Sequence, residues 1–148
     1  MNPRYKIHSE QAAAAFIAKG WNLSLAIYAE GIEEAYEFLM EKVSDDLVAP
    51  SSEDINSLTK VFRIDDCLSI QDRGLVISLG IAKKSGTKVS EGDQVIVIGE
   101  QNGNIFDVSM PISLNLKSEF VPILIRKACK EKVKIGYSVW LKTKMDNK

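Results

Sequence analysis

The chain has one histidine, His8, among its 148 residues, and it has no G-x-x-x-x-G-K-[ST] motif. One histidine cannot form a multi-histidine metal site, and His8 is interpreted as a surface residue beside a helix rather than as part of a catalytic triad. Without the glycine-rich motif, no loop is available to hold nucleotide phosphates and their magnesium ion. We therefore expect no enzymatic activity, no catalytic residue, no nucleotide, no metal and no cofactor.

Cysteines and long apolar runs are also scarce. Cys67 and Cys129 are far apart and form no C-x-x-C pattern, which predicts buried free thiols in a reducing compartment. No run reaches the roughly 18 apolar residues of a membrane-crossing helix, and the N-terminus lacks the apolar core of a secretory signal. We expect a cytoplasmic protein without a membrane partner, large enough to bury a core unaided.

Charge is distributed unevenly along the chain. Residues 1–60 carry 5 Lys and Arg against 10 Asp and Glu, whereas residues 61–148 carry 14 against 10. The two parts therefore differ in sign although the net charge is only −1. Such asymmetry favours either docking of the two parts on each other or binding of an anionic partner by the basic part.

Residues 10–19 carry consistent helix signals. Ser9 can cap the first turn, five alanines favour the helix, and Gly20 follows the last residue. Residues 21–30 are ambiguous, because Leu23 and Leu25 alternate as in a strand while a preceding asparagine could cap a helix. We favour a helix there.

Residues 32–43 show the clearest helical pattern in the acidic part. Six apolar residues recur at helical spacing, namely Ile32, Ala35, Tyr36, Leu39, Met40 and Val43. This stripe is interpreted as core, with a partner groove as the alternative. Ser51 and Asp54 then resemble a capping box that opens a short helix over residues 53–59. Residues 1–60 are thus expected to form a helical N-terminal region.

After residue 60 the apolar residues alternate at period two, which is typical of strands with one buried face. Runs at 62–70 and 75–81 flank a polar turn from Gln71 to Gly74, and a third run covers 95–98. Asn102-Gly103-Asn104 predicts a further hairpin turn. The pattern predicts an α+β fold in which residues 61–142 form a small antiparallel β-barrel or sandwich and residues 143–148 form a basic tail.

Two ordered segments carry a resemblance to a known family. They read Phe62-x-Ile64-Asp65-Asp66-x-Leu68-Ser69-Ile70-x-x-Arg73-Gly74-x-Val76-Ile77, continued by Glu91-Gly92-Asp93-x-Val95-x-Val97-Ile98, and Val121-x-Ile123-Leu124-Ile125-Arg126 followed by Lys130-Glu131-x-Val133-x-x-Gly136. Together they resemble the second, β-barrel domain of translational GTPases of the elongation factor Tu type. The resemblance implies the barrel fold without the GTPase domain.

The resemblance also implies pocket positions, and there the sequence departs from the family. The pocket that holds the aminoacyl end of tRNA would map to Asp65, Asp66, Leu68 and Phe120. In the family a Phe stands where this chain has Leu68, and an Asn stands where it has Phe120. Both a base-stacking ring and a polar contact are therefore replaced, so tRNA binding is not expected. Asp72 replaces a family glycine.

A cluster of basic side chains is the main candidate for partner binding. The candidates are Arg73, Lys83, Lys84, Arg126, Lys127, Lys130, Lys132 and Lys134. Clustered cations attract phosphates, although few aromatic residues accompany these. Three interpretations stay open: a contact with RNA, a solvated surface or dock for the acidic part, and an acidic protein partner. The three aspartates Asp65, Asp66 and Asp72 could also form a cation or acid–base cluster, which we consider the weaker alternative.

The sequence as a whole predicts a non-enzymatic binding module that docks a protein or ribonucleoprotein partner. The alternative is a bacterial immunity or antitoxin-type protein that binds and blocks a toxin domain, because small chains without catalytic motifs often have that role.

Overall fold

The computed structural model describes residues 4–28, 36–82, 84, 89, 91–99, 103–109, 119–126 and 133–142. Its two helices are α1 (Glu10–Ala18) and α2 (Ser52–Asn56). Its strands are β1 (Arg4–Ile7), β2 (Asn22–Tyr28), β3 (Tyr36–Glu41), β4 (Leu58–Arg63), β5 (Asp66–Ile70), β6 (Gly74–Ala82), β7 (Gln94–Ile98), β8 (Gly103–Ser109), β9 (Phe120–Ile125) and β10 (Ser138–Lys142). Neither described helix has the length and apolar character needed to cross a membrane.

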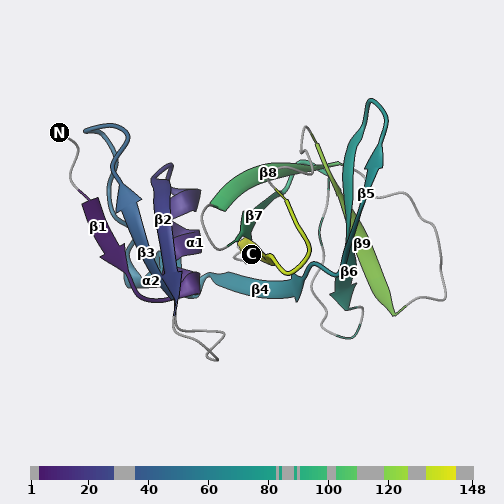
Figure 1. The fold of residues 1–148 in the computed structure, drawn as a ribbon, viewed down its shortest axis with the longest axis horizontal. Coiled ribbons are helices and arrows are strands. Elements are labelled where there is room, and N and C mark those ends of the chain that lie inside the picture. Colours follow the sequence, from purple (N-terminus) through teal and green to yellow (C-terminus); the bar gives the residue numbers. More distant parts are fainter. Residues whose placement is uncertain are drawn as a thin grey trace, which may run out of the picture.

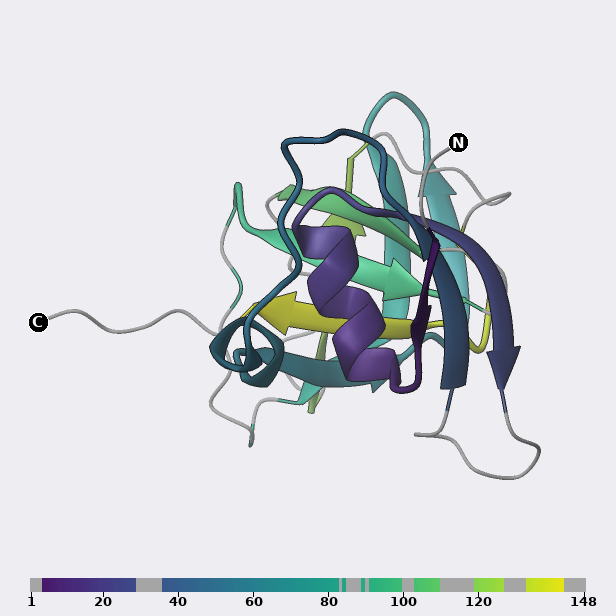
Figure 2. The ribbon, with the colours of Figure 1, turned by 90° about the vertical axis from the view of Figure 1, so that its left-hand side faces the viewer.

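The elements form three layers, with α1 between two antiparallel sheets (Figure 1). The small sheet has the order β1-β3-β2, and the large sheet has the order β4-β10-β7-β8-β9-β6-β5. Seen from the side of the small sheet, α1 runs across β10 and β7 (Figure 2). The predicted β-rich α+β fold is therefore confirmed.

The small sheet occupies most of the region predicted to be helical. Residues 22–28 and 36–41 are paired strands, so the helices predicted over them are wrong. In β3 the buried residues are Phe38 and Met40, while the intervening Leu39 is only partly buried. That is burial at period two, and Phe38, which the predicted helical stripe left out, is fully buried. Residues 29–35 lie outside the described part of the chain.

The helix α1 is buried on more than one side. Ser9 caps it, accepting a hydrogen bond from the Ala12 N–H at 3.1 Å, as the sequence predicts. The consecutive residues Ala13, Ala14 and Ala15 are all at most 2% exposed. A helix packed on one side alone would turn at least one of three consecutive residues to water, so the alanines require a partner on each flank.

The strand β7 is the clearest case of burial on both faces. Val95 and Val97 belong to one hydrophobic core, and Ile96 and Ile98 belong to another. The strand's continuous apolar sequence reflects this double burial. The core that contains Ile96 and Ile98, here called the first core, joins the small sheet and α1 to the outer face of the large sheet. Its residues are Ile7, Ala13, Ala14, Ala15, Ile17, Trp21, Leu23, Phe38, Met40, Leu58, Ile96, Ile98 and Trp140.

The second core lies inside the bend of the large sheet. It contains Phe62, Ile64, Leu75, Ile77, Ile81, Val95, Val97, Val108, Ile123, Ile125, Val133, Val139 and Leu141. Among the described residues two pairs, Val108↔Ile125 and Ser109↔Leu124, join β8 to β9, and the sheet bends sharply at this short ladder (Figure 1).

The bend does not produce a closed barrel in the described residues. The strand order leaves β4 and β5 as the two edges, although the Asp65 N–H donates to the Ser78 carbonyl at 2.6 Å beyond the end of β4. The predicted division at residues 60 and 61 falls within β4, which begins at Leu58. Cys67, on β5, is half-buried and is not part of a disulfide.

A buried carboxylate lies where α1 meets the large sheet. Glu10 is 4% exposed, Ser138 of β10 hydrogen-bonds to it, and Trp140 Nε1 donates to the Ser138 hydroxyl at 3.0 Å. Lys60 Nζ is 4.0 Å from Glu10 Oε1, an atom without a hydrogen-bond partner among the described residues. Burial raises the pKa of Glu10, and Ser138, Lys60, Arg63 and Trp140 offset only part of that increase.

Glu10→Gln should remove one source of pH dependence in stability. Because the pKa of Glu10 is raised in the folded state, its contribution to stability is present below the unfolded pKa and is lost as pH rises through the folded pKa. The free energy of unfolding, measured by urea denaturation at pH values upward from the ordinary glutamate pKa, should fall more steeply for the parent than for the variant. Glu53→Gln, an exposed first-turn residue of α2, is the matched control. Parallel curves for parent and Glu10→Gln would contradict this expectation.

A fragment that starts at Leu58 should not fold stably. It would expose Ile96, Ile98 and Trp140, each worth roughly 1.5–3 kcal/mol when buried, and their sum approaches the stability of a small domain. Circular dichroism and light scattering should show loss of cooperative melting together with self-association. Ile96→Thr with Ile98→Thr in the fragment should reduce the association. A monomeric fragment with a cooperative transition would show that residues 58–142 form an independent domain.

Candidate functional site

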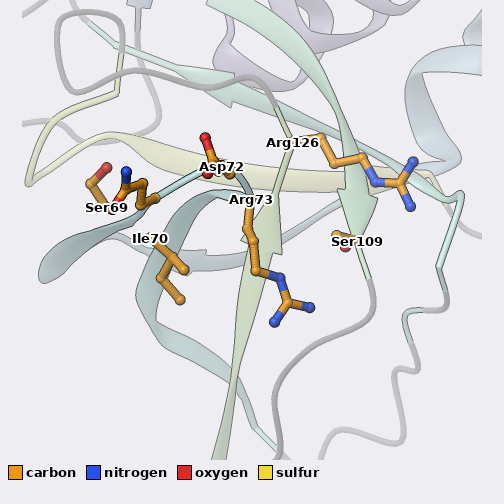
Figure 3. A pocket seen from close by; sticks show the side chains of 8 residues that line it. Ser69, Ile70, Asp72, Arg73, Ser109 and Arg126 are labelled. Carbon is orange, nitrogen blue, oxygen red and sulfur yellow. The ribbon is translucent and has the colours of Figure 1, made fainter.

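A groove of about 560 Å³ opens where the β5–β6 turn meets the ends of β8 and β9 (Figure 3). It is lined by Ser69, Ile70, Gln71, Asp72, Arg73, Gly74, Ser109 and Arg126. This volume is within the range of roughly 300–1,000 Å³ that small-molecule sites occupy in proteins.

Strand pairing brings these distant segments together. Leu75 pairs with Ile125, which sets the start of β6 beside the end of β9. Val108 also pairs with Ile125, which sets the end of β8 on the other side of β9. Arg73 and Arg126, far apart in the sequence, consequently reach one groove.

The β5–β6 turn has a left-handed residue at its third position. The Arg73 N–H donates to the Ile70 carbonyl at 3.1 Å, and Asp72 has φ of 66°. Positive φ at that position is typical of a type II turn, in which glycine or asparagine is favoured. Aspartate tolerates this conformation better than most side chains, so the turn forms although the sequence has no glycine there.

Gly74 permits close approach of the turn to β9. A Cβ atom at this position would collide with the Ile125 carbonyl and would lie 3.2 Å from the Arg126 Cα. Its φ of +138° is also one that glycine adopts readily. Gly92, in the turn before β7, also has positive φ, of 92°.

Arg126 is held by its backbone and by its side chain. Its N–H donates to the Asp107 carbonyl at 2.9 Å, and its Nη2 donates to Glu91 Oε2 at 2.7 Å. The turn that carries Glu91 is itself fixed to β8, because the Gly92 N–H donates to the Val108 carbonyl at 2.9 Å. About half of each side chain of the Arg126–Glu91 pair is exposed, so the pair orients the guanidinium more than it stabilises the fold.

Arg73 contributes the second guanidinium and is exposed. In Figure 3 its side chain extends from the turn, Ser109 lies between it and Arg126, and the Asp72 carboxylate points away from the Arg73 guanidinium. The described residues of the groove lining thus carry two positive charges and one negative charge. Arginine forks bind planar or tetrahedral oxyanions, so an anion is the ligand class that this lining fits.

The structure brings together only two of the predicted basic residues. Arg73 and Arg126 line the groove, whereas Lys84 and Lys134 are exposed and do not line it. The remaining four candidates lie outside the described part of the chain, namely Lys83, Lys127, Lys130 and Lys132.

None of the positions implied by the family resemblance is among the described residues that line this groove. Asp65 and Asp66 lie at the start of β5, and Asp66 Oδ1 accepts from the Cys67 N–H at 2.9 Å. Leu68 is 58% exposed on the same edge strand. Phe120 is half-buried two strands away, paired with Ala82.

The weaker hypothesis of an acidic cluster is not supported. Asp65 and Asp66 precede or begin β5, whereas Asp72 follows its other end, so the strand separates them. Among the described residues, no group of three or more His, Cys, Asp or Glu side chains is placed to hold a metal ion.

Two residues of the candidate site are not predicted from the sequence. Ser109 lines the groove, and Glu91 pairs with Arg126, but the partners are 35 residues apart for the ion pair and no local pattern links them. In the sequence, Glu91-Gly92-Asp93 is recognisable only as part of the family resemblance. Its placement depends on the bend between β8 and β9.

Gly74→Ala should destabilise the protein more than Gly92→Ala. Both substitutions force alanine into positive φ, at a cost of roughly 1–3 kcal/mol, but only the Gly74 variant adds a collision with backbone, worth roughly 1–3 kcal/mol more. No atom lies within 4 Å of a Cβ at Gly92, so the Gly92 variant carries the cost of positive φ alone. The difference in free energy of unfolding between the two variants, measured by urea denaturation, therefore gives the cost of the collision. Equal losses of stability in the two variants would contradict this prediction, because they would mean that β9 shifts away from the added Cβ at no cost in free energy.

The groove is therefore defined by an unusual turn, a glycine contact and two arginines from separate strands. Comparisons of the chain with protein-family models, curated proteins and solved structures find no match, so its chemistry rests on these residues alone.

Proposed function

We propose that this chain is a non-enzymatic binding module that docks a ribonucleoprotein partner through the bent seven-stranded sheet. The observation that carries the proposal is the convergence of Arg73 and Arg126 on one groove. Exposed guanidiniums attract the RNA backbone without reading its sequence, and phosphate contacts of this kind position a protein on its partner.

Part of the proposal is that the sheet is a variant of the barrel in the second domain of elongation factor Tu-type GTPases. In its support, the resembling segments form β4, β5, β6, β7 and β9, and β5, β6 and β9 are neighbours in the sheet. The bend that wraps these strands around one core is also in keeping with a barrel ancestor.

Retention of the full chain on RNA should fall steeply with salt and depend on the groove. Arg73→Gln with Arg126→Gln should weaken binding and reduce the slope of log affinity against log salt by about 0.7, the value for loss of one phosphate contact. Filter binding to total RNA across a salt series measures both quantities.

Lys6→Gln with Lys19→Gln is the control, because it removes equal charge from two exposed side chains of the N-terminal part. This control should retain the parental slope. RNA retention that is absent or insensitive to salt would sink the proposal. A stable stoichiometric protein complex that survives RNase treatment would instead favour the antitoxin-type alternative.

A further inference from the structure

We propose that the groove is a phosphate-binding subsite in which the guanidiniums of Arg73 and Arg126, with the Ser109 hydroxyl, bind one phosphate group of the RNA backbone. This assignment rests on the proposed function and makes it specific. Its ligand class is a phosphodiester, and free inorganic phosphate shares the same chemistry.

The donors needed for this role are available. Each guanidinium has five N–H donors in a planar fork that fits phosphate oxygens. Among the described residues, the Arg126 guanidinium pairs only with Glu91, through Nη2, so Nε and Nη1 can meet a ligand. The Ser109 hydroxyl lies between the two arginines in Figure 3 and adds a neutral donor.

The Glu91 carboxylate does not block the subsite. The pair with Arg126 is half-exposed on both sides, and such pairs contribute roughly 0–1 kcal/mol. A hydrogen bond from a guanidinium to phosphate in a concave site is charge-assisted and stronger than a neutral one. Before phosphate binds, Glu91 holds the Arg126 guanidinium in place at the groove. Phosphate can then bind beside the Glu91 carboxylate or displace it.

Asp72 limits the affinity of the subsite. Among the described residues of the groove lining it is the one that carries a negative charge, and it occupies a left-handed position that a neutral asparagine would tolerate equally well. Repulsion between an exposed carboxylate and a phosphate several ångströms away is small in water, so removing the charge should tighten binding by about twofold. The direction of this effect is opposite to that expected for loss of an arginine.

The groove is larger than one phosphate requires. Its volume of about 560 Å³ leaves room for the sugar on either side of a phosphodiester. A single inorganic phosphate should therefore bind weakly. A chain of nucleotides should bind more tightly, because once one phosphate is bound its neighbours are held close to further contacts on the protein.

Nuclear magnetic resonance titration of the full chain tests this assignment. Inorganic phosphate and a single-stranded oligouridine of about ten nucleotides, a length within the footprint of small β modules, are the two probes. Both should shift the Arg73, Gly74, Ser109 and Arg126 amide signals and the Nε–H signals of both arginines. Asp72→Asn should bind oligouridine about twofold more tightly, and Arg73→Gln or Arg126→Gln should each weaken it about tenfold.

The outcomes separate the subsite from the proposed function. Lys6→Gln with Lys19→Gln should leave both titrations unchanged, and cooperative unfolding should verify that every variant is folded. Oligouridine binding with shifts outside the groove would overturn the subsite and leave the function standing. Phosphate shifts in the groove without oligouridine binding would support the subsite and overturn the function. No response to either probe would overturn both.

Discussion

Burial of β7 on both faces is the constraint on which the rest of the structure depends. Val95 and Val97 need the bent half of the large sheet, while Ile96 and Ile98 need α1 and the small sheet. Both packing partners are needed, because a face of β7 that is open to water loses most of its contribution to the stability of the fold. The acidic N-terminal part and the basic β part are consequently two halves of one fold, and the change in charge sign near residue 60 does not mark a structural boundary.

The contact between these halves is not purely apolar. Ile17 packs against Gly103, where a side chain on the glycine would collide with it, so the helix approaches the β7–β8 hairpin as closely as backbone allows. Glu10 lies at the positive end of the helix and among polar groups of β4 and β10. Apolar packing fixes how closely α1 approaches the large sheet. The Glu10 carboxylate fixes the rotation of α1 about its own axis, because only one rotation brings this carboxylate to Ser138 and Lys60.

The sequence was most informative where local signals act alone. Alternation identified β6, a short apolar run identified β7, the Ser9 cap identified α1, and the Ser51–Asp54 capping box identified the start of α2, although the helix ends at Asn56 and not at residue 59. It misled at residues 36–41, where apolar residues fit both helical and strand spacing. Pairing with β1 and β2 decides that segment, and this pairing is invisible in a local window.

The groove shows the same division between local and distant information. The composition of the β5–β6 turn could be read directly, and Arg126 stood out in a basic run, but their meeting depends on β6 and β8 both pairing with Ile125.

Asp72 connects the turn to the chemistry of the groove. A glycine at φ of 66° would serve the turn equally well, so the backbone alone does not require a carboxylate there. With Asp72, the lining residues that the structure describes have a net charge of +1, and Glu91 partly balances Arg126 from outside the groove. A groove so nearly neutral favours weak, reversible contact with one phosphate over tight capture of a polyanion. Such contacts suit the docking role proposed above, in which many weak contacts are made and broken together.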